Sequence, residues 1–405
     1  MSPVISIAKS FPVWLLTVPV IFIVFIFITW SPAAKEDDKV VPSPQGVPAL
    51  GNAQDIPRTP PWIKFAQWGK ELGPLFKLTI LHQTHVIISD EKITQTLLED
   101  RGLHYSDRPW YNFTCGVLTG NLHLLLLPNN GSFTLSVFTA LLTCTDRFRR
   151  YRSFLHSVMS NTAASKYESI QILEAKRMLD SLIADPIQYD RWLDRFSSSL
   201  TARLTWGKRV ETGEEEFLRT LHDIKNTFEQ VGSRGSQLYN RFPSLLLLPD
   251  WIAPLKRTAR RLQEWEANFF KRLINETRLD LAAGVAQLSF ARHFIENKAV
   301  TGLSETEGAY VLGGVFEAGV DIAAAQIKSF CLALCLYPEW QDKMQTEIDA
   351  VCGERMPEFA DMPSLPVTRA ILVEVARWRP ACPGGISQLQ ILIQSQSICG
   401  NTASY

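Results

Sequence analysis

The feature that most constrains the fold is a long apolar run, rich in alanine and glycine, from Val311 to Leu336. Its length and apolar character predict one long helix. The segment from Phe316 to Ala323 is unusual within it. Gly319 costs about 1 kcal/mol relative to alanine inside a helix, and Asp321 needs partners if it is buried. Either this helix packs on another helix with Asp321 at an exposed edge, or it passes a flat cofactor, with Gly319 allowing close approach and Asp321 handling protons.

Composition narrows the class of protein. The chain has 405 residues, 46% hydrophobic and 20% charged, enough for one large globular domain or two ordinary ones. Lys+Arg and Asp+Glu both number 41, so the net charge favours neither nucleic acid nor an acidic partner. The seven cysteines have no CxxC spacing, which disfavours a disulfide framework or a zinc site. Cys331 and Cys335 share a helix face and are expected to be a core pair rather than a metal pair.

The N-terminal segment is suited to a membrane. No charged residue lies between Ser10 and Ala34, and about 20 apolar residues span a bilayer. We therefore predict a transmembrane anchor over residues 1–34. A signal peptide is the alternative, but it would have a shorter apolar region and a small-x-small cleavage site. The flanking charges favour a cytosolic body. Residues 35–52, with closely spaced proline and glycine, predict a stiff linker.

The body of the chain predicts a mainly α fold with a small β region near its start. Residues 75–80 and 84–89 have the pattern of two strands around a turn. Asp90 is placed to cap a helix that continues through Leu98. Apolar residues then recur at three- and four-residue spacing, which predicts helices that include residues 175–182, 217–222, 262–279 and 367–378.

Two groups of charged residues have two interpretations each. Four arginines crowd into residues 146–152, either as a solvated helix face or as an anion clamp, because guanidinium groups bind carboxylates and phosphates in bidentate geometry. Glu374 and Arg377 are three positions apart and can pair on a helix face. Surface pairs of this kind contribute little to stability, so a functional role needs other support.

The order of these features resembles the cytochrome P450 family, the haem-thiolate monooxygenases, and in particular the microsomal-type enzymes of fungal secondary metabolism. Ala318 to Asp321 is similar to the family's oxygen-activating helix. Phe148 and Arg152 stand at the Trp and Arg of the family's Trp-x-x-x-Arg, which contacts the haem propionates. The segment from Glu374 to Arg377 matches the family's Glu-x-x-Arg. The resemblance implies a P450-like domain over residues 53–386.

The resemblance also implies a role for each matching residue. Arg152, with Phe148 beside it, would hold a haem propionate. Gly319 would let dioxygen and substrate lie against the helix, and Asp321 would relay protons. Glu374 and Arg377 would brace the fold behind the haem.

Three departures from the family pattern count against activity in this chain. Ile322 replaces the usual threonine, whose hydroxyl helps to deliver protons. Residues 131–145 interrupt the family pattern as an insertion that resembles translated intron sequence. No cysteine fits Phe-x-x-Gly-x-Arg-x-Cys-x-Gly, so the axial ligand is missing, and the tail over residues 387–405 resembles nothing in the family. We therefore expect a C-terminally truncated fold that does not bind haem stably.

The function implied by the resemblance is a monooxygenase of the endoplasmic reticulum membrane with a cytosolic body. It would oxidise an apolar natural product with electrons from an NADPH-dependent reductase, and it would not bind nucleic acid. Glycosylation sequons at Asn112, Asn130 and Asn275 would then stay unmodified. The alternatives are a non-catalytic, membrane-anchored binding protein and the product of a mis-spliced or frame-shifted gene.

Overall fold

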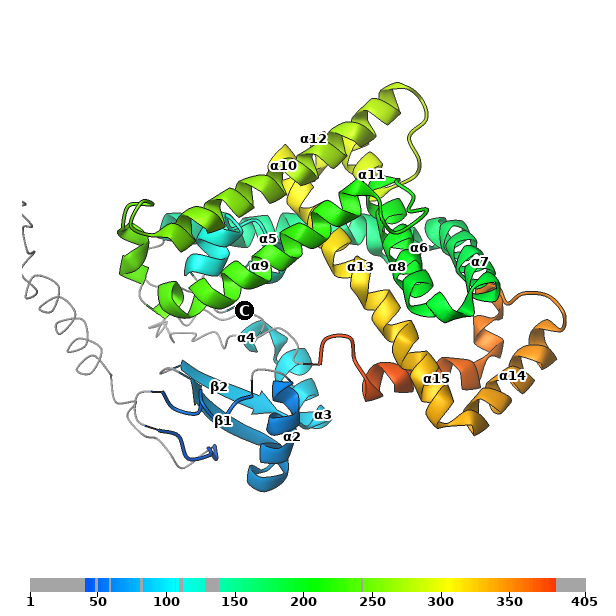
Figure 1. The fold of residues 1–405 in the computed structure, drawn as a ribbon, viewed down its shortest axis with the longest axis horizontal. Helices are drawn as coiled ribbons and strands as arrows, with labels where there is room; N and C mark the ends of the chain where they lie inside the picture. The colour runs from blue at the N-terminus through cyan, green and yellow to red at the C-terminus, as the bar shows by residue number, and fades with distance from the viewer. Residues whose placement is uncertain are drawn as a thin grey trace, which may run out of the picture. The chain divides into compact units, whose positions relative to one another are not determined.

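The computed structural model describes residues 41–47, 50–57, 60–80, 83–105, 107–108, 112–127, 138–241 and 243–383 (Figure 1). It divides into two compact units, residues 1–103 and residues 104–405. Each unit has a hydrophobic core of its own. The predicted tail, residues 387–405, and residues 131–137 of the predicted insertion lie outside the described residues, so both remain predictions.

The first unit contains the predicted pair of strands. Strands β1 (Leu75–Ile80) and β2 (Gln83–Ile88) are antiparallel, with Leu75 opposite Ile88 and Ile80 opposite Gln83. Helix α2 (Pro61–Leu72) covers them, and Trp68, Phe76 and Leu78 form the buried core. The strand prediction is confirmed, with β2 beginning one residue earlier than expected.

The helix predicted after Asp90 is also present. The Asp90 side chain accepts a hydrogen bond of 2.9 Å from the Ile93 amide at the start of α3 (Glu91–Thr94), as expected for an N-cap. Wider π-helical turns, η1 (Gln95–Asp100), then continue α3, and the short α4 (Gly102–Tyr105) follows.

The second unit is almost entirely helical in the residues that the structure describes, which confirms the mainly α prediction. Every helical segment predicted from spacing lies inside a longer helix. The longer helices are α5 (Phe138–Met159), α7 (Glu168–Ala184), α8 (Tyr189–Trp206), α9 (Glu216–Arg241), α10 (Pro254–Ala282), α13 (Glu305–Leu336), α14 (Pro338–Cys352) and α15 (Pro366–Trp378). The shorter elements are η2 (Asn112–Leu118), η3 (Leu124–Leu126), α6 (Asn161–Ala164), η4 (Ser165–Tyr167), η5 (Pro186–Gln188), η6 (Pro243–Leu247), α11 (Phe290–Glu296), α12 (Lys298–Thr301) and η7 (Phe359–Ser364).

Helix α13, yellow in Figure 1, is the predicted long apolar helix. It begins with a capping box in which Ser304 Oγ accepts from the Glu307 amide at 3.2 Å and the Glu307 carboxylate accepts from the Ser304 amide at 2.9 Å. By length and composition, α13 is the one helix of the described residues that could cross a membrane. Its buried residues lie between Glu307 and Ala324, where it packs against α8 and α10. The predicted anchor, residues 1–34, lies outside the described residues.

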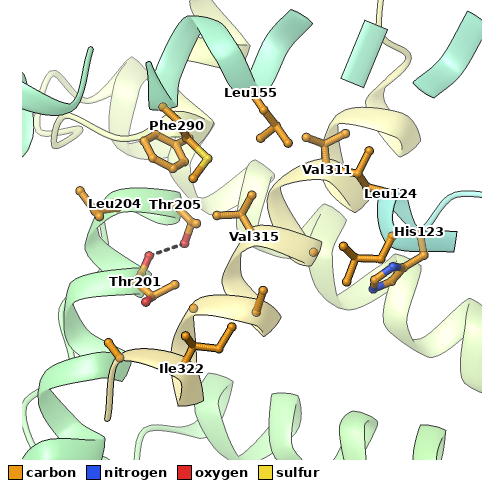
Figure 2. Close-up of a pocket in the computed structure, with 16 residues that line it drawn as sticks. His123, Leu124, Leu155, Thr201, Leu204, Thr205, Phe290, Val311, Val315 and Ile322 are labelled. Carbon is orange, nitrogen blue, oxygen red and sulfur yellow. Dashed lines mark hydrogen bonds between the residues drawn. The ribbon is translucent and has the colours of Figure 1, made fainter. Parts of the chain in front are cut away.

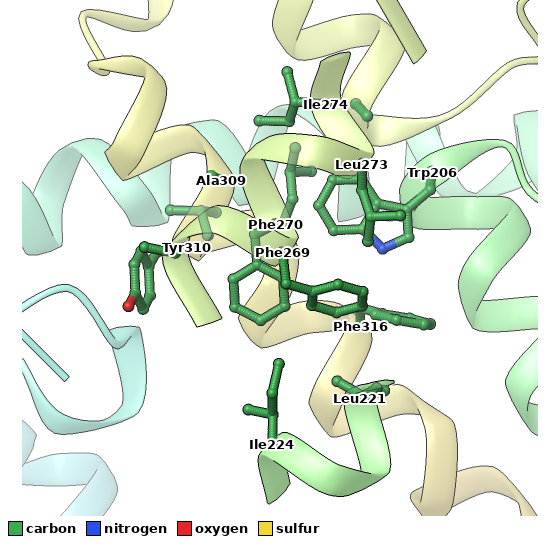
Figure 3. Close-up of a cluster of buried hydrophobic side chains, with 14 of the residues drawn as sticks. Trp206, Leu221, Ile224, Phe269, Phe270, Leu273, Ile274, Ala309, Tyr310 and Phe316 are labelled. Atoms are coloured by element: carbon green, nitrogen blue, oxygen red, sulfur yellow. The ribbon is translucent and has the colours of Figure 1, made fainter. Parts of the chain in front are cut away.

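The core of the second unit forms where α8, α9, α10 and α13 meet. Phe316 is fully buried there, with its ring edge-on to Trp206 at 6.2 Å and stacked on Phe217 at 6.1 Å between ring centroids. Phe270 and Tyr310 meet edge-on at 5.8 Å in the same cluster (Figure 3). Aromatic rings of α8, α9 and α10 therefore pack against the rings of α13.

One expectation about the core is wrong. Cys331 and Cys335 are both exposed rather than a core pair. Helical spacing correctly places them on one face, but that face of the last turns of α13 is exposed among the described residues. Residues 138–145, the second part of the predicted insertion, form the first turns of α5, and their status as an insertion remains a prediction.

Candidate functional site

A cavity of about 440 Å³ lies beside α13 (Figure 2). Its longest wall is one face of α13, which contributes residues at successive spacings of three and one. The other walls come from α5, α8, α11 and the residues around η3. The α13 residues are Val311, Gly314, Val315, Ala318, Gly319, Ile322 and Ala323. Such spacing is that of a single helix face. The wall is apolar because these residues are all glycine or aliphatic.

The sequence singled out part of this wall and missed the rest. Gly319 and Ile322 were expected beside the site, and both line the cavity. Val311, Gly314 and Val315 were not singled out, although they lie on the same face at helical spacing. Counting back in steps of four from Gly319 finds Val315 and Val311, and one such step from Ala318 finds Gly314.

Helix α8 comes close to α13 at Gly319. A Cβ atom at this position would lie 2.5 Å from Thr201 Cγ2 and 2.7 Å from Thr201 Oγ1. Ser197 Oγ also donates a hydrogen bond of 2.9 Å to the Gly319 carbonyl oxygen. The first interpretation of this glycine, packing of one helix on another, therefore describes its contacts. Its role toward dioxygen remains a prediction.

We expect Gly319→Ala to lower the free energy of unfolding by about 1 kcal/mol. Overpacking against the stiff β-branched Thr201 costs about 1–3 kcal/mol, and the gain in helix propensity of about 1 kcal/mol offsets part of it. Gly314→Ala is the matched control, because a Cβ there meets nothing within 4 Å, and it should raise stability by up to about 1 kcal/mol. Urea denaturation measures both variants. Equal effects at the two positions would contradict the close contact, whereas Thr201→Ala should rescue Gly319→Ala.

Asp321 lies at an exposed edge of α13. Its side chain is 60% exposed and forms an ion pair with Lys225 of α9, and it is not among the residues that line the cavity. Ile322, its neighbour, does line the cavity and presents only methyl and methylene groups to it. Proton relay by Asp321 remains a prediction.

Two of the four clustered arginines clamp a carboxylate of the chain itself. Arg147 Nε and Arg150 Nη2 each donate to Glu307 Oε1 at 2.9 Å. Burial alone raises the pKa of Glu307, but hydrogen bonds from Ser304 and Arg147 hold that pKa below its ordinary value. These two arginines thus bind an anion of the chain itself, Glu307, and the clamping of a haem propionate by the arginine cluster remains a prediction.

The two residues expected at the haem propionates have different surroundings. Phe148 is partly buried against the main core, and Arg152 is exposed. Neither is among the residues that line the cavity. Their role toward a propionate remains a prediction.

Glu374 and Arg377 pair on α15 as predicted. Arg377 Nη2 and Nε donate to the two carboxylate oxygens at 2.6 and 2.7 Å. The hydrogen bond from Arg377 lowers the pKa of Glu374. Both side chains are exposed, and α15 packs against α13 and α14. A bracing role for the pair remains a prediction.

A polar group at one end of the cavity was missed by the sequence analysis. His123, just before η3, lines the cavity, and its Nε2 lies 3.3 Å from Glu317 Oε2 of α13. Glu266 of α10 is 2% exposed and acts electrostatically on both. These residues are far apart in the sequence, so no local pattern joins them. The presence of Glu317 inside the segment from Phe316 to Ala323 was the one available signal.

The cavity meets only part of what haem requires. Its apolar wall, with the small residues Ala318 and Gly319, suits a flat apolar group. The thiolate that favours dioxygen cleavage in haem-thiolate enzymes has no counterpart, because none of the residues that line the cavity in the described part of the chain is a cysteine. The described residues that line the cavity therefore do not supply the donor set of a haem-thiolate centre.

Comparisons with known proteins agree on one family. The sequence matches the family model described as cytochrome P450 over residues 41–389. It is 30% identical over 363 residues to cytochrome P450 monooxygenase 58 of Postia placenta, covering 89% of this chain and 66% of that protein. It is 29% identical over 340 residues to cytochrome P450 monooxygenase fogE of Aspergillus ruber, covering 84% and 60%. Its identity to cytochrome P450 monooxygenase virE of Hypocrea virens is 27% over 360 residues, which cover 89% of this chain and 62% of that protein. The chain thus spans just under two thirds of the length of these relatives.

Proposed function

Because this chain belongs to the cytochrome P450 family, we propose that its fold serves a haem-dependent monooxygenase that oxidises an apolar small molecule. The observation that carries the proposal is the apolar cavity wall on α13, built around the segment that resembles the oxygen-activating helix. Its volume of about 440 Å³ falls in the range of about 300–1,000 Å³ usual for ligand pockets. In the family, haem supplies the activation of oxygen.

Each matching residue has a part in this proposal. Arg152, supported by Phe148, binds a carboxylate of the cofactor. Gly319 has no side chain and so leaves room beside α13 for small molecules. Asp321 exchanges protons with solvent, which its exposure allows. Glu374 and Arg377 fix α15 against α13 and α14.

The wider setting is also proposed. We infer that residues 1–34 anchor the protein in the endoplasmic reticulum membrane, that an NADPH-dependent reductase supplies electrons, and that the substrate belongs to secondary metabolism. The apolar anchor sequence and the resemblance to microsomal enzymes support this setting. The near-zero net charge supports a small-molecule substrate over nucleic acid.

The 405 residues are not expected to form the haem-thiolate centre by themselves, because none of the seven cysteines carries the family pattern. A carbon monoxide difference spectrum of the reduced, membrane-expressed chain tests this. We expect no thiolate-type band, whereas cytochrome P450 monooxygenase 58 of Postia placenta, expressed in the same way, should give one. A thiolate-type band from this chain would show that it is competent.

A second candidate, a non-catalytic binding protein, is favoured by an apolar cavity that no cysteine lines in the described residues. Calorimetry with naphthalene as an apolar probe measures binding directly. Gly314→Leu fills the cavity from a position with open space and should weaken binding at least about tenfold, whereas the exposed Val300→Leu should not. Binding without any haem signal favours the binding protein. Binding that Gly314→Leu leaves unchanged would contradict both candidates.

A further inference from the structure

Four polar side chains from three parts of the chain interact with one another, and one of them, His123, lines the cavity. Tyr310 and Glu317 are seven positions apart, which places them on one face of α13 two turns apart. Glu266 lies on the facing helix α10, and His123 precedes η3. We refer to these four residues as the proton cluster. Figure 2 shows the imidazole of His123 at the edge of the cavity beside Leu124.

The contacts inside the cluster are short. His123 Nε2 lies 3.3 Å from Glu317 Oε2. The Tyr310 hydroxyl donates to the Gln263 carbonyl oxygen at 3.2 Å and accepts from the Gln263 side chain at 3.3 Å. The same hydroxyl is within hydrogen-bonding reach of the Glu266 carboxyl. Tyr310, Glu317 and His123 therefore all act on the Glu266 carboxyl.

Burial makes the charge of this cluster costly. Glu266 is 2% exposed, and the side chains of Glu317 and His123 are 14% and 15% exposed. Glu266 Oε2 and His123 Nδ1 are buried without a hydrogen-bond partner among the described residues. No arginine or lysine of those residues acts on Glu266. Arg147 of α5 is bound to Glu307 and to the Asn121 carbonyl oxygen.

Two carboxylates and one imidazole cannot all be ionised cheaply in such a place, because like charges and desolvation both oppose it. Burial first, and then the charge of Glu317, raise the pKa of Glu266 to about 7. Burial alone would lower the pKa of His123, but the hydrogen bond and charge of Glu317 raise it above its ordinary value. Both shifts therefore have the same direction, because they favour the protonated forms of Glu266 and of His123.

We propose that the proton cluster shares its protons as one unit and keeps His123 as an imidazolium at the cavity wall, ready to donate to an oxygen atom of a ligand. The donor is Nδ1, the ring nitrogen that has no partner among the described residues. The imidazolium keeps its proton while it donates this hydrogen bond, so no covalent bond forms or breaks. The donor role rests on the proposed function, since it needs a ligand in the cavity, but the sharing of protons does not.

Infrared pH titration of the full chain tests the shared protons, because a protonated buried carboxyl has a carbonyl band that disappears on ionisation. We expect a band that is lost around pH 7 in the unaltered chain and is absent in Glu266→Gln. Glu307→Gln, which removes another carboxylate of limited exposure on α13, should keep the band. A band that survives in Glu266→Gln overturns the proposal. Tyr310→Phe, which keeps the packing, should move the titration to higher pH, because the phenol lowers the pKa of Glu266.

Thermal stability gives a second readout with a definite sign. The pKa of Glu266 is raised from its ordinary 4.5 to about 7 in the folded chain, so the folded state binds more protons between these values. Its contribution to stability is complete below pH 4.5 and is lost as pH rises through about 7. The melting temperature should therefore fall between pH 5 and pH 8, and Glu266→Gln should flatten that slope. An unchanged slope in the variant overturns the proposal.

The donor role is tested with two probes that differ by one acceptor oxygen, naphthalene and 1-acetylnaphthalene. We expect the ketone to bind about tenfold more tightly at pH 6 than at pH 9, and His123→Gln to remove this dependence while naphthalene binding stays constant. A pH-independent preference for the ketone overturns the donor role. If neither probe binds but the carboxyl band titrates, the proposed function fails while the proton cluster is supported.

Discussion

Phe316→Ala should lower the free energy of unfolding by about 3–5 kcal/mol, the usual cost of replacing a buried phenylalanine by alanine. Phe316 is 0% exposed and contacts the rings of Trp206 and Phe217. The cavity left behind cannot close easily, because its walls include the large rigid rings of Trp206 on α8 and Phe217 on α9. Part of the loss is the aromatic pairing itself, about 0.5–1.5 kcal/mol per pair.

Urea denaturation followed by tryptophan fluorescence and circular dichroism measures this loss. Leu336→Ala is a suitable control, because Leu336 lies at the end of the same helix and is 54% exposed. It should change stability by only about 0.5 kcal/mol. Similar losses in the two variants would mean that α13 is not held in the chain's core in the way the contacts describe.

Glu174→Ala should cost about 3–5 kcal/mol, because it leaves Arg203 without its carboxylate and Arg209 with only the exposed Glu211. Glu174 on α7 is 0% exposed, with Arg203 Nη1 of α8 at 2.7 Å and Arg209 Nε at 3.5 Å from its Oε1. Both guanidinium groups are themselves mostly covered. The cost is therefore that of unpaired charge rather than of a lost surface contact.

The matched control is Glu211→Ala, which also removes a carboxylate beside Arg209 but at a site 60% exposed. We expect a loss of about 0–1 kcal/mol there. The double variant Glu174→Ala/Arg203→Met should be more stable than Glu174→Ala alone, because it removes one of the stranded charges. If the double variant is less stable by the sum of two independent losses, the pairing does not carry the effect.

Local patterns were sufficient for the secondary structure. The strand pair, the Asp90 cap, the long helix α13 and the Glu374–Arg377 pair all depend on residues close in sequence, and each is present. Periodicity and capping report on such short separations directly.

The contacts that the sequence could not predict join residues that are far apart along the chain. Gly319 and Ser197 are 122 positions apart, and His123 and Glu317 are 194 apart. No spacing rule joins them, so the sequence could not tell which helix comes closest to Gly319 or that Glu317 has a histidine beside it. The exposure of Cys331 was missed for the same reason, because elements distant in the sequence decide whether a helix face is covered.

Glu307 is both a member of the capping box of α13 and the carboxylate that Arg147 and Arg150 hold. One side chain therefore sets where the helix starts and how it is anchored to α5. The start of α13 therefore sets the direction in which its cavity-lining residues face. Each added residue turns the rest of a helix by about 100°. An insertion between Glu307 and Val311 would rotate the whole apolar face away from the cavity without altering a single residue that lines it.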